Sequence, residues 1–127
     1  MGPESASSGT FAAAEHYSTD GFGPARAVNR TSVVGQAEYK LTDTTTARVM
    51  GSTYVSSFDS PGVLRLSDIV GRKIDRFGSY DTHQGGDANR HQLVIDLTRA
   101  DESSRFTFAP YFIVRSMRLR ENYTGYL

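Results

Sequence analysis

The sequence predicts a β-rich fold, an antiparallel sandwich or a small barrel with one short helix, preceded by an extended N-terminal arm. Apolar and polar residues alternate from Val33 to Leu41 and again from Leu93 to Leu97, which is the period of a half-buried strand. Residues 1–30 are rich in Ser, Ala, Gly and Thr, as is typical of a segment without a core of its own. We therefore expect an arm (1–30), a β-rich domain (31–120) and a short C-terminal tail (121–127).

The arm carries its large apolar side chains singly. Met1–Gly9 is rich in Ser and Gly and is expected to be flexible in isolation, whereas Thr10–Tyr17 could form a short helix. The sequence Gly21-Phe22-Gly23-Pro24 then interrupts regular structure. Aromatic residues spaced in this way suit docking into successive pockets of a partner, and the anchors we predict are Phe11, Tyr17 and Phe22.

The first half of the domain is expected to hold two long strands. From Thr31 the period becomes two, and a second strand segment follows from Ala47 to Phe58, with a bulge or bend at Gly51. Ser60-Pro61-Gly62 is a turn signal, after which Val63–Leu66 is expected to form a short strand. The core is expected to come mostly from residues 31–119.

A helix is predicted over Ser67–Phe77. Ser67 could cap it, Asp68 is favourable in its first turn, and Gly78 could end it. Gly71 opposes this helix, because glycine in a helix interior costs about 1 kcal/mol relative to Ala. The polar, glycine-containing segment that follows, residues 79–90, is predicted to be a loop.

The last part of the domain is predicted to form two strands, His91–Thr98 and Arg105–Leu119. Phe106, Phe108 and Phe112 share one parity in the second strand and are expected to face inward. The apolar parity then changes, so a bulge or break is expected near Arg115–Ser116. Pro110 has no N–H for the ladder, which places this stretch on an edge or at the bulge, and a partner could cover such an edge.

Composition excludes several classes of function. The chain has no cysteine, so disulfides, thiolate metal sites and a cysteine nucleophile are excluded. Fourteen basic residues balance fourteen acidic ones, so no net field favours nucleic acid or an anionic membrane. No apolar segment is long enough to span a membrane, and residues 1–10 lack the pattern of a signal peptide. We expect an intracellular protein, or one within an assembled particle.

The chemistry-bearing residues predict no enzyme and no cofactor. His83, Asp87 and His91 supply the donor set of a non-haem iron or zinc site, but their i, i+4, i+8 spacing converges only in a helix, and Gly85-Gly86 opposes one. The competing interpretation is a solvated loop. A Gly85-Gly86 phosphate cradle lacks the Lys-Ser/Thr pair of a phosphate-binding loop. A small metal-dependent enzyme using the 81–91 loop is therefore the least favoured alternative.

Arginine is strongly preferred over lysine, twelve to two. GC-rich coding would produce this bias, and so would use at interfaces, because the planar guanidinium pairs with carboxylates and stacks on rings. Arg105, Arg115, Arg118 and Arg120 alternate with aromatic residues, a combination that holds single-stranded RNA in some β modules. RNA binding is therefore the main alternative function.

The function that the sequence favours is structural. We expect a linker, accessory or decoration subunit that docks into a large assembly, such as a virus or phage particle or an organellar or photosynthetic complex. Its partners would be other protein subunits. The residues expected at the interface come from the arm, the last strand and the tail: Phe11, Tyr17, Phe22, Arg26, Arg30, Arg115, Arg118, Arg120, Tyr123 and Tyr126.

Overall fold

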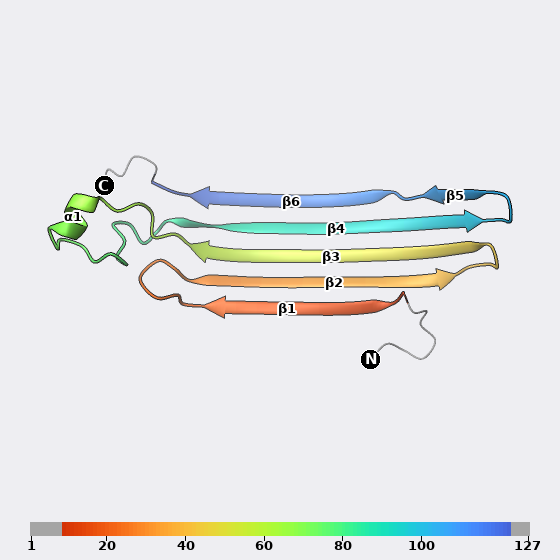
Figure 1. Ribbon diagram of the computed structural model, residues 1–127, viewed down its shortest axis with the longest axis horizontal. Coiled ribbons are helices and arrows are strands. Elements are labelled where there is room, and N and C mark those ends of the chain that lie inside the picture. The colour runs from red at the N-terminus through yellow and green to blue at the C-terminus, as the bar shows by residue number, and fades with distance from the viewer. Residues whose placement is uncertain (1–8, 123–127) are drawn as a thin grey trace. The chain divides into compact units, whose positions relative to one another are not determined.

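The computed structural model describes residues 9–122, and their main feature is one sheet of six antiparallel strands (Figure 1). The neighbours in the sheet follow the order β1-β2-β3-β4-β5, and β6 also pairs with β4. A single short helix, α1, lies in the connection between β3 and β4. The bounds of the elements are β1 Phe11–Thr19, β2 Val28–Lys40, β3 Thr45–Asp59, α1 Leu66–Val70, β4 Gly85–Ala100, β5 Arg105–Phe108 and β6 Tyr111–Arg120.

The β-rich class with one short helix is confirmed. The sheet has neither of the two expected architectures. Its six strands belong to one sheet, which does not close into a barrel and is not a sandwich of two sheets. Consecutive strands are joined by short connections except between β3 and β4, so the pairing is largely that of neighbours along the chain.

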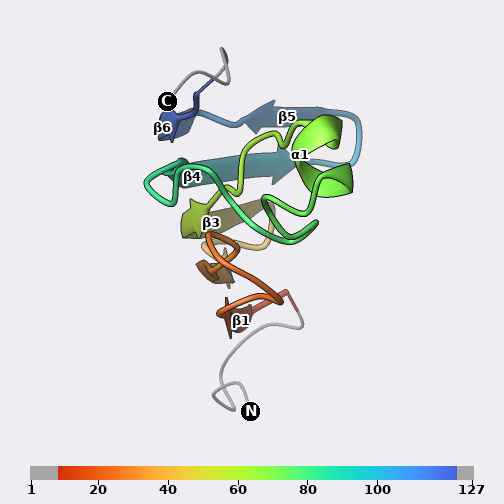
Figure 2. The same cartoon turned by 90° about the vertical axis from the view of Figure 1, so that its left-hand side faces the viewer.

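Contacts divide the chain into two units. Unit 1 takes its described residues from 9–15, 32–54 and 90–115, and unit 2 from 16–31, 55–89 and 116–122. Most strands contribute residues to both units. Figure 2 faces the end of unit 2 that carries α1 and the connections around it.

The segment predicted to be an arm contains regular structure. Phe11–Thr19 forms β1, an edge strand paired with β2, and not the short helix considered for Thr10–Tyr17. The strand continues although its alanines favour a helix, because the pairing supplied by β2 overrides local preference. Residues 1–8 lie outside the described part of the chain.

The helix is shorter than predicted. It spans Leu66–Val70 and ends at Gly71, and Arg72 has a left-handed φ of 54°. Arg65, not Ser67, occupies the N-cap position, and the expected strand over Val63–Leu66 does not form because α1 begins at Leu66. Gly71 therefore marks the C-terminal end of α1 and does not lie in the interior of a longer helix.

The polar loop is also shorter than predicted, because β4 begins at Gly85. Gly85 has a φ of 143°, and a Cβ there would collide with the carbonyl oxygen of Phe58 in β3. A Cβ on Gly86 would collide in the same way with the carbonyl oxygen of Arg118 in β6. The two glycines thus allow close approach of neighbouring backbones, which is a common reason for glycine in a strand.

The last strand is interrupted at residues 109–110, and not near Arg115–Ser116, where β6 runs without a break. Pro110 explains the position, since it has no N–H to donate. Its carbonyl still accepts a hydrogen bond from the amide of Ile95 at 3.1 Å. The interruption therefore changes the ladder without detaching the chain from β4.

No apolar side chain in the described part of the chain is buried. The buried residues there are Ser56, Gln84, Gly85 and Gly86, which are polar or lack a side chain. The expectation that residues 31–119 supply a core was wrong for the chain by itself, and Phe106, Phe108 and Phe112 remain 56–68% exposed. None of the described helices is long and apolar enough to cross a membrane.

Candidate functional site

The two faces of the sheet in unit 1 are identified by the pairing of β4 with β5. Leu97 lies opposite Phe108, and Thr98 lies opposite Thr107. The hydroxyl oxygens of Thr98 and Thr107 are 3.1 Å apart, so both side chains are on the same face. Because successive side chains alternate, Leu97, Phe106 and Phe108 lie on the opposite face.

The face that carries Thr98 and Thr107 is polar across four strands, and we call it the polar face. A hollow of about 250 Å³ lies on it. The guanidinium of Arg48 donates to Oε2 of Glu38 from Nη2 at 2.9 Å and from Nε at 3.1 Å. The hollow contains two guanidinium groups, of Arg48 and Arg105, and two carboxylates, of Glu38 and Asp96. These charges balance, so the hollow has no net positive charge that would attract phosphate. Its lining residues are Glu38, Thr46, Arg48, Asp96, Thr98, Arg105 and Thr107.

The opposite face of the same strands is apolar. Glu38, Arg48 and Asp96 lie on the polar face, so their sequence neighbours on β2, β3 and β4 lie on the opposite one. Thr53 Oγ1 and His91 Nδ1 are 3.0 Å apart, which shows that β3 and β4 keep the same alternation further along. We define the apolar face as Ala37, Tyr39, Ala47, Val49, Leu93, Ile95, Leu97, Phe106 and Phe108.

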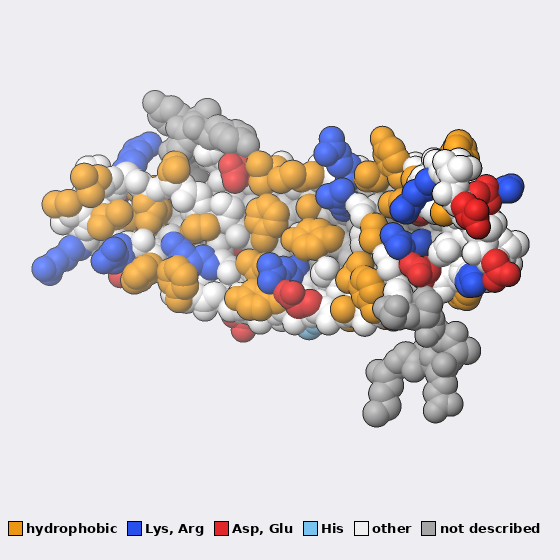
Figure 3. All heavy atoms as spheres, turned by 45° about the vertical axis from the view of Figure 1, so that its right-hand side comes forward, with side chains coloured by type: hydrophobic (Ala, Val, Ile, Leu, Met, Phe, Trp, Pro, Cys, Tyr) orange, Lys and Arg blue, Asp and Glu red, His pale blue; other side chains and the backbone are white. Residues whose placement is uncertain are grey.

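This apolar face is open to solvent. Tyr39 is 60% exposed, Phe106 68% and Phe108 56%, and the larger aliphatic residues are 37–43% exposed apart from Ile95, which is half-buried. Figure 3 shows that hydrophobic side chains also reach the surface over much of the side of the molecule that it presents. Single exposed apolar residues are ordinary, but a contiguous apolar face is typical of an interaction surface.

The arm residues predicted to bind a partner interact with the chain itself in unit 2. Phe22 packs edge-to-face on Phe77 with ring centroids 5.4 Å apart, and the Arg26 guanidinium lies 5.2 Å from the Phe22 ring centre. Arg26 Nη1 also donates to the carbonyl oxygens of Phe77 at 2.5 Å and Pro24 at 3.1 Å. These contacts close the β1–β2 connection onto the segment after α1.

The remaining predicted interface residues lie in different places. Arg30 stacks over Tyr17 at 5.2 Å, and Phe11 is half exposed on β1. The three arginines of β6 are exposed. Tyr123 and Tyr126 lie outside the described residues. The structure therefore brings Tyr17 and Arg30 together, and it leaves the arginines Arg115, Arg118 and Arg120 on the surface.

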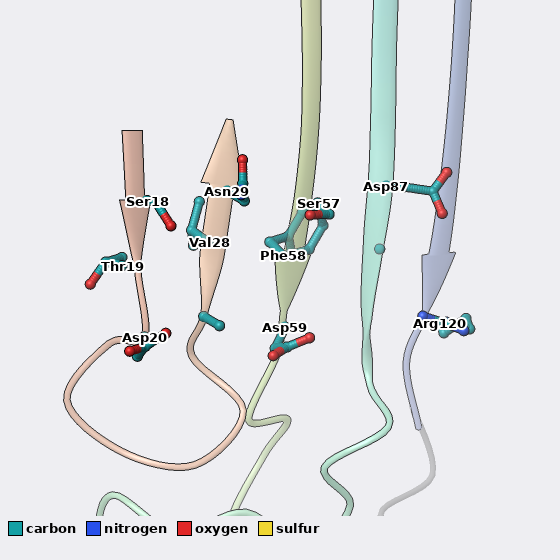
Figure 4. Close-up of a pocket in the computed structure, with 12 residues that line it drawn as sticks. Ser18, Thr19, Asp20, Val28, Asn29, Ser57, Phe58, Asp59, Asp87 and Arg120 are labelled. Carbon is teal, nitrogen blue, oxygen red and sulfur yellow. The ribbon is translucent and has the colours of Figure 1, made fainter. Parts of the chain in front are cut away.

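A second hollow, of about 340 Å³, lies in unit 2 between strand ends (Figure 4). Asp20, Asp59, Asp87 and Arg120 contribute its charges. Figure 4 shows Asp87 directed away from Asp20 and Asp59, so the carboxylates do not share a centre. Within residues 9–122 no group of three acidic or histidine side chains is placed to hold a metal ion.

The three residues considered as metal ligands have different neighbours. His83 is paired with Asp81, with Nδ1 3.2 Å from Oδ1, and His91 binds Thr53. Asp87 lines the hollow of unit 2. The loop after α1 also holds a polar pair that the sequence did not indicate: the Tyr80 hydroxyl donates to Asp68 Oδ2 at 2.5 Å. This bond is the main cause of a lowered pKa at Asp68 and a raised pKa at Tyr80.

No protein-family model, curated protein or solved structure matches this chain. The candidate site therefore depends on the geometry alone, and the feature that distinguishes it is the apolar face of unit 1. Sequence alternation indicated its members on β2, β4 and β5, and the pairing of Thr98 with Thr107 identifies which face those of β4 and β5 share.

Proposed function

We propose that this chain is a structural subunit of a larger protein assembly and binds its neighbours through the apolar face of unit 1. The observation that carries the proposal is that no apolar side chain among the described residues is buried. Burial of apolar surface is the main favourable term in folding and in most protein association. A sheet with one polar and one apolar face meets this requirement when another layer covers the apolar face.

The exposed area supports the same proposal. Tyr39 is 60% exposed, Phe106 68% and Phe108 56%, all on the apolar face of unit 1. A contiguous apolar surface of this kind is typical of an interaction site. An assembly of the kind expected from the sequence, a virus or phage particle or an organellar complex, would use such surface.

The test is to follow the natural chain by size in extracts of the cells that make it. We expect it in particles much heavier than 14.0 kDa. Phe106→Glu places a charge on the apolar face and should release the chain, whereas Thr107→Glu, its neighbour on the polar face, should leave it in the particles. A natural chain that runs as a free monomer, or a Phe106→Glu chain that stays in the particles, would overturn the proposal.

Truncation of residues 1–30 would not test the predicted arm cleanly. It would remove the whole of β1 and the first residues of β2, beginning at Val28, as well as the predicted anchors. The edge of β2 would then be unpaired, and an exposed strand edge promotes aggregation by itself. Point substitutions on the apolar face avoid this effect.

RNA binding is a second candidate because Phe106 and Phe108 are exposed rings beside Arg105 in β5. Exposed aromatic rings can stack on bases. However, Arg105 lies on the polar face with Glu38 and Asp96, and the rings lie on the other face. An affinity for single-stranded RNA that falls steeply with salt would support RNA binding in place of the assembly role.

A further inference from the structure

We infer that the partner covering the apolar face of unit 1 is a second copy of this chain, with the two sheets packed face to face. This inference deepens the proposed function and rests on it, since it names the first neighbour in the assembly. The interface would be isologous, so the same residues would meet on both copies across a two-fold axis. Two sheets packed in this way lie about 10 Å apart and interdigitate their side chains.

The apolar face is rich enough in area for such a dimer. The rings of Tyr39, Phe106 and Phe108, at about 200 Å² for each fully exposed ring, expose roughly 370 Å². Val49, Leu93 and Leu97 add further apolar area at 37–43% exposure. The face thus approaches the roughly 800 Å² per partner of a standard interface before its polar rim is included.

The charge pattern permits self-association. None of the residues that define the apolar face is charged, so two copies in contact would bring no like charges together. Arg99 shares the parity of Leu97, but it lies near the β4–β5 connection and pairs with Asp101 at 3.3 Å. The chain as a whole has no net charge, so its copies do not repel one another over a distance.

The main competing mode of self-association uses the edge of the sheet. β1 is an edge strand with a row of alanines, and such a strand can pair with a strand of another chain. Edge pairing, however, would extend the sheet and leave the apolar face of unit 1 in water. Only a layer stacked on that face buries Tyr39, Phe106 and Phe108, which favours face-to-face packing.

The first experiment measures the mass of the purified full chain by sedimentation equilibrium over a range of concentrations. We expect a dimer that dissociates on dilution. Phe106→Glu should raise the dimer dissociation constant by about 100-fold or more, because each of the two copies carries a charge into the interface. Thr107→Glu, on the adjacent position and the other face, should leave it unchanged. A monomer at all concentrations, or a dimer unaffected by Phe106→Glu, would overturn the inference.

A second experiment holds even if the charged variant fails to fold. The chain has no cysteine, so a single introduced thiol reports one position. Ala47→Cys lies on the apolar face, and Thr46→Cys lies beside it on the polar face. We expect Ala47→Cys to react slowly with a maleimide at high protein concentration and rapidly on dilution, while Thr46→Cys reacts rapidly throughout. Equal reactivity of Ala47→Cys at both concentrations would overturn the inference.

These outcomes separate the inference from the proposed function. If the purified chain is a monomer with a reactive apolar face, but it still enters heavy particles in cell extracts through Phe106, the partner is a different protein. The inference then fails and the assembly role stands. If the purified chain dimerises through the apolar face but never enters larger particles, the dimer stands and the assembly role fails. A dimer in which the Ala47→Cys thiol still reacts rapidly would indicate pairing through the sheet edge, such as β1, and would also overturn the inference.

Discussion

The hydroxyl oxygens of Thr98 and Thr107 lie 3.1 Å apart across β4 and β5. This contact assigns the threonines to the same face as the hollow that holds Glu38 and Arg48. It also places Phe106 and Phe108, the two neighbours of Thr107, on the opposite face, where they are largely exposed. One hydrogen bond thus distinguishes a polar surface that faces water from an apolar surface that requires a partner.

If the apolar face is covered by another copy, stability should depend on protein concentration. Because association stabilises only the folded state, the melting temperature should rise when the chain is concentrated 100-fold, with up to about 2.7 kcal/mol of added stability. Differential scanning fluorimetry at two concentrations measures this effect. The Phe106→Glu chain is the control and should melt at nearly the same temperature at both. A natural chain whose melting temperature does not change with concentration would contradict the prediction.

Gly85→Ala should destabilise unit 2. Gly85 has a φ of 143°, and an added Cβ would meet the Phe58 carbonyl oxygen in β3. Forcing a residue with a side chain into such a conformation costs about 1–3 kcal/mol, before the collision is considered. Urea unfolding at a fixed protein concentration measures the loss.

Gly51→Ala is the matched control for this substitution. Gly51 also lies within a strand, but the nearest atom to an added Cβ, the Gln92 carbonyl oxygen, is 3.9 Å away. Alanine should be tolerated there, or should stabilise the strand by about 0.5 kcal/mol because it reduces the freedom of the unfolded chain. Equal urea midpoints for Gly85→Ala and the natural chain would show that the backbone at Gly85 can relax.

Local alternation predicted most of the long strands and the members of the apolar face on β2, β4 and β5, but it did not single out Ala47 and Val49 on β3. It could not predict that Gly85-Gly86 belongs to a strand, because the reason lies in the backbones of β3 and β6, which are distant in sequence. β1 was missed for a related reason, since its pairing with β2 outweighs the helical preference of its alanines. Phe106 and Phe108 were expected to face a core, but the layer they face is not supplied by residues 9–122.

The candidate site was predictable only in part. Arg26 and Phe22 were chosen as partner contacts, and instead they contact each other and Phe77. Nothing local marks Phe77 as their neighbour, because 51 positions separate it from Arg26. The polar face was missed, because Arg48 shares the parity of Met50 and Tyr54 in its predicted strand, whereas Glu38 lies on the polar parity of its own. Pairing Glu38 with Arg48 across the turn at 42–46 would have indicated it.

The Asp68–Tyr80 pair should give the loop around α1 a stability that depends on pH. Asp68 has a pKa below its ordinary value of 3.8, mainly because the Tyr80 hydroxyl donates to it. Its contribution is therefore present above about pH 4 and is lost as the pH falls through the lowered pKa. Tyr80 has a pKa above its ordinary value of 10.0, mainly because of the same bond. Its contribution is present below pH 10 and is lost as the pH rises through the raised pKa.

Nuclear magnetic resonance titration of the Asp68 carboxyl group checks this pair. In Tyr80→Phe the pKa of Asp68 should move up toward 3.8. Lys73→Met should raise it by a smaller amount, because the Lys73 ammonium is 3.6 Å from Oδ1 and has less influence on the pKa than the tyrosine hydroxyl. An Asp68 titration that is the same in Tyr80→Phe and the natural chain would show that the bond does not persist in solution.

Arg26→Ala should loosen the β1–β2 connection and the segment after α1 together. The Arg26 guanidinium donates to the Phe77 carbonyl oxygen at 2.5 Å and stacks over Phe22. Loss of this exposed, charge-assisted bond should cost about 1 kcal/mol, which corresponds to amide exchange about five times faster in peptides covering 21–27 and 72–80. Arg26→Lys should restore little of the protection. A planar guanidinium can stack on the Phe22 ring and donate to the Phe77 carbonyl oxygen at once, whereas the compact ammonium of lysine cannot stack on the ring. Full protection in Arg26→Lys would mean that charge alone holds the two segments, and unchanged exchange in Arg26→Ala would mean that Phe22 and Phe77 hold them without the arginine.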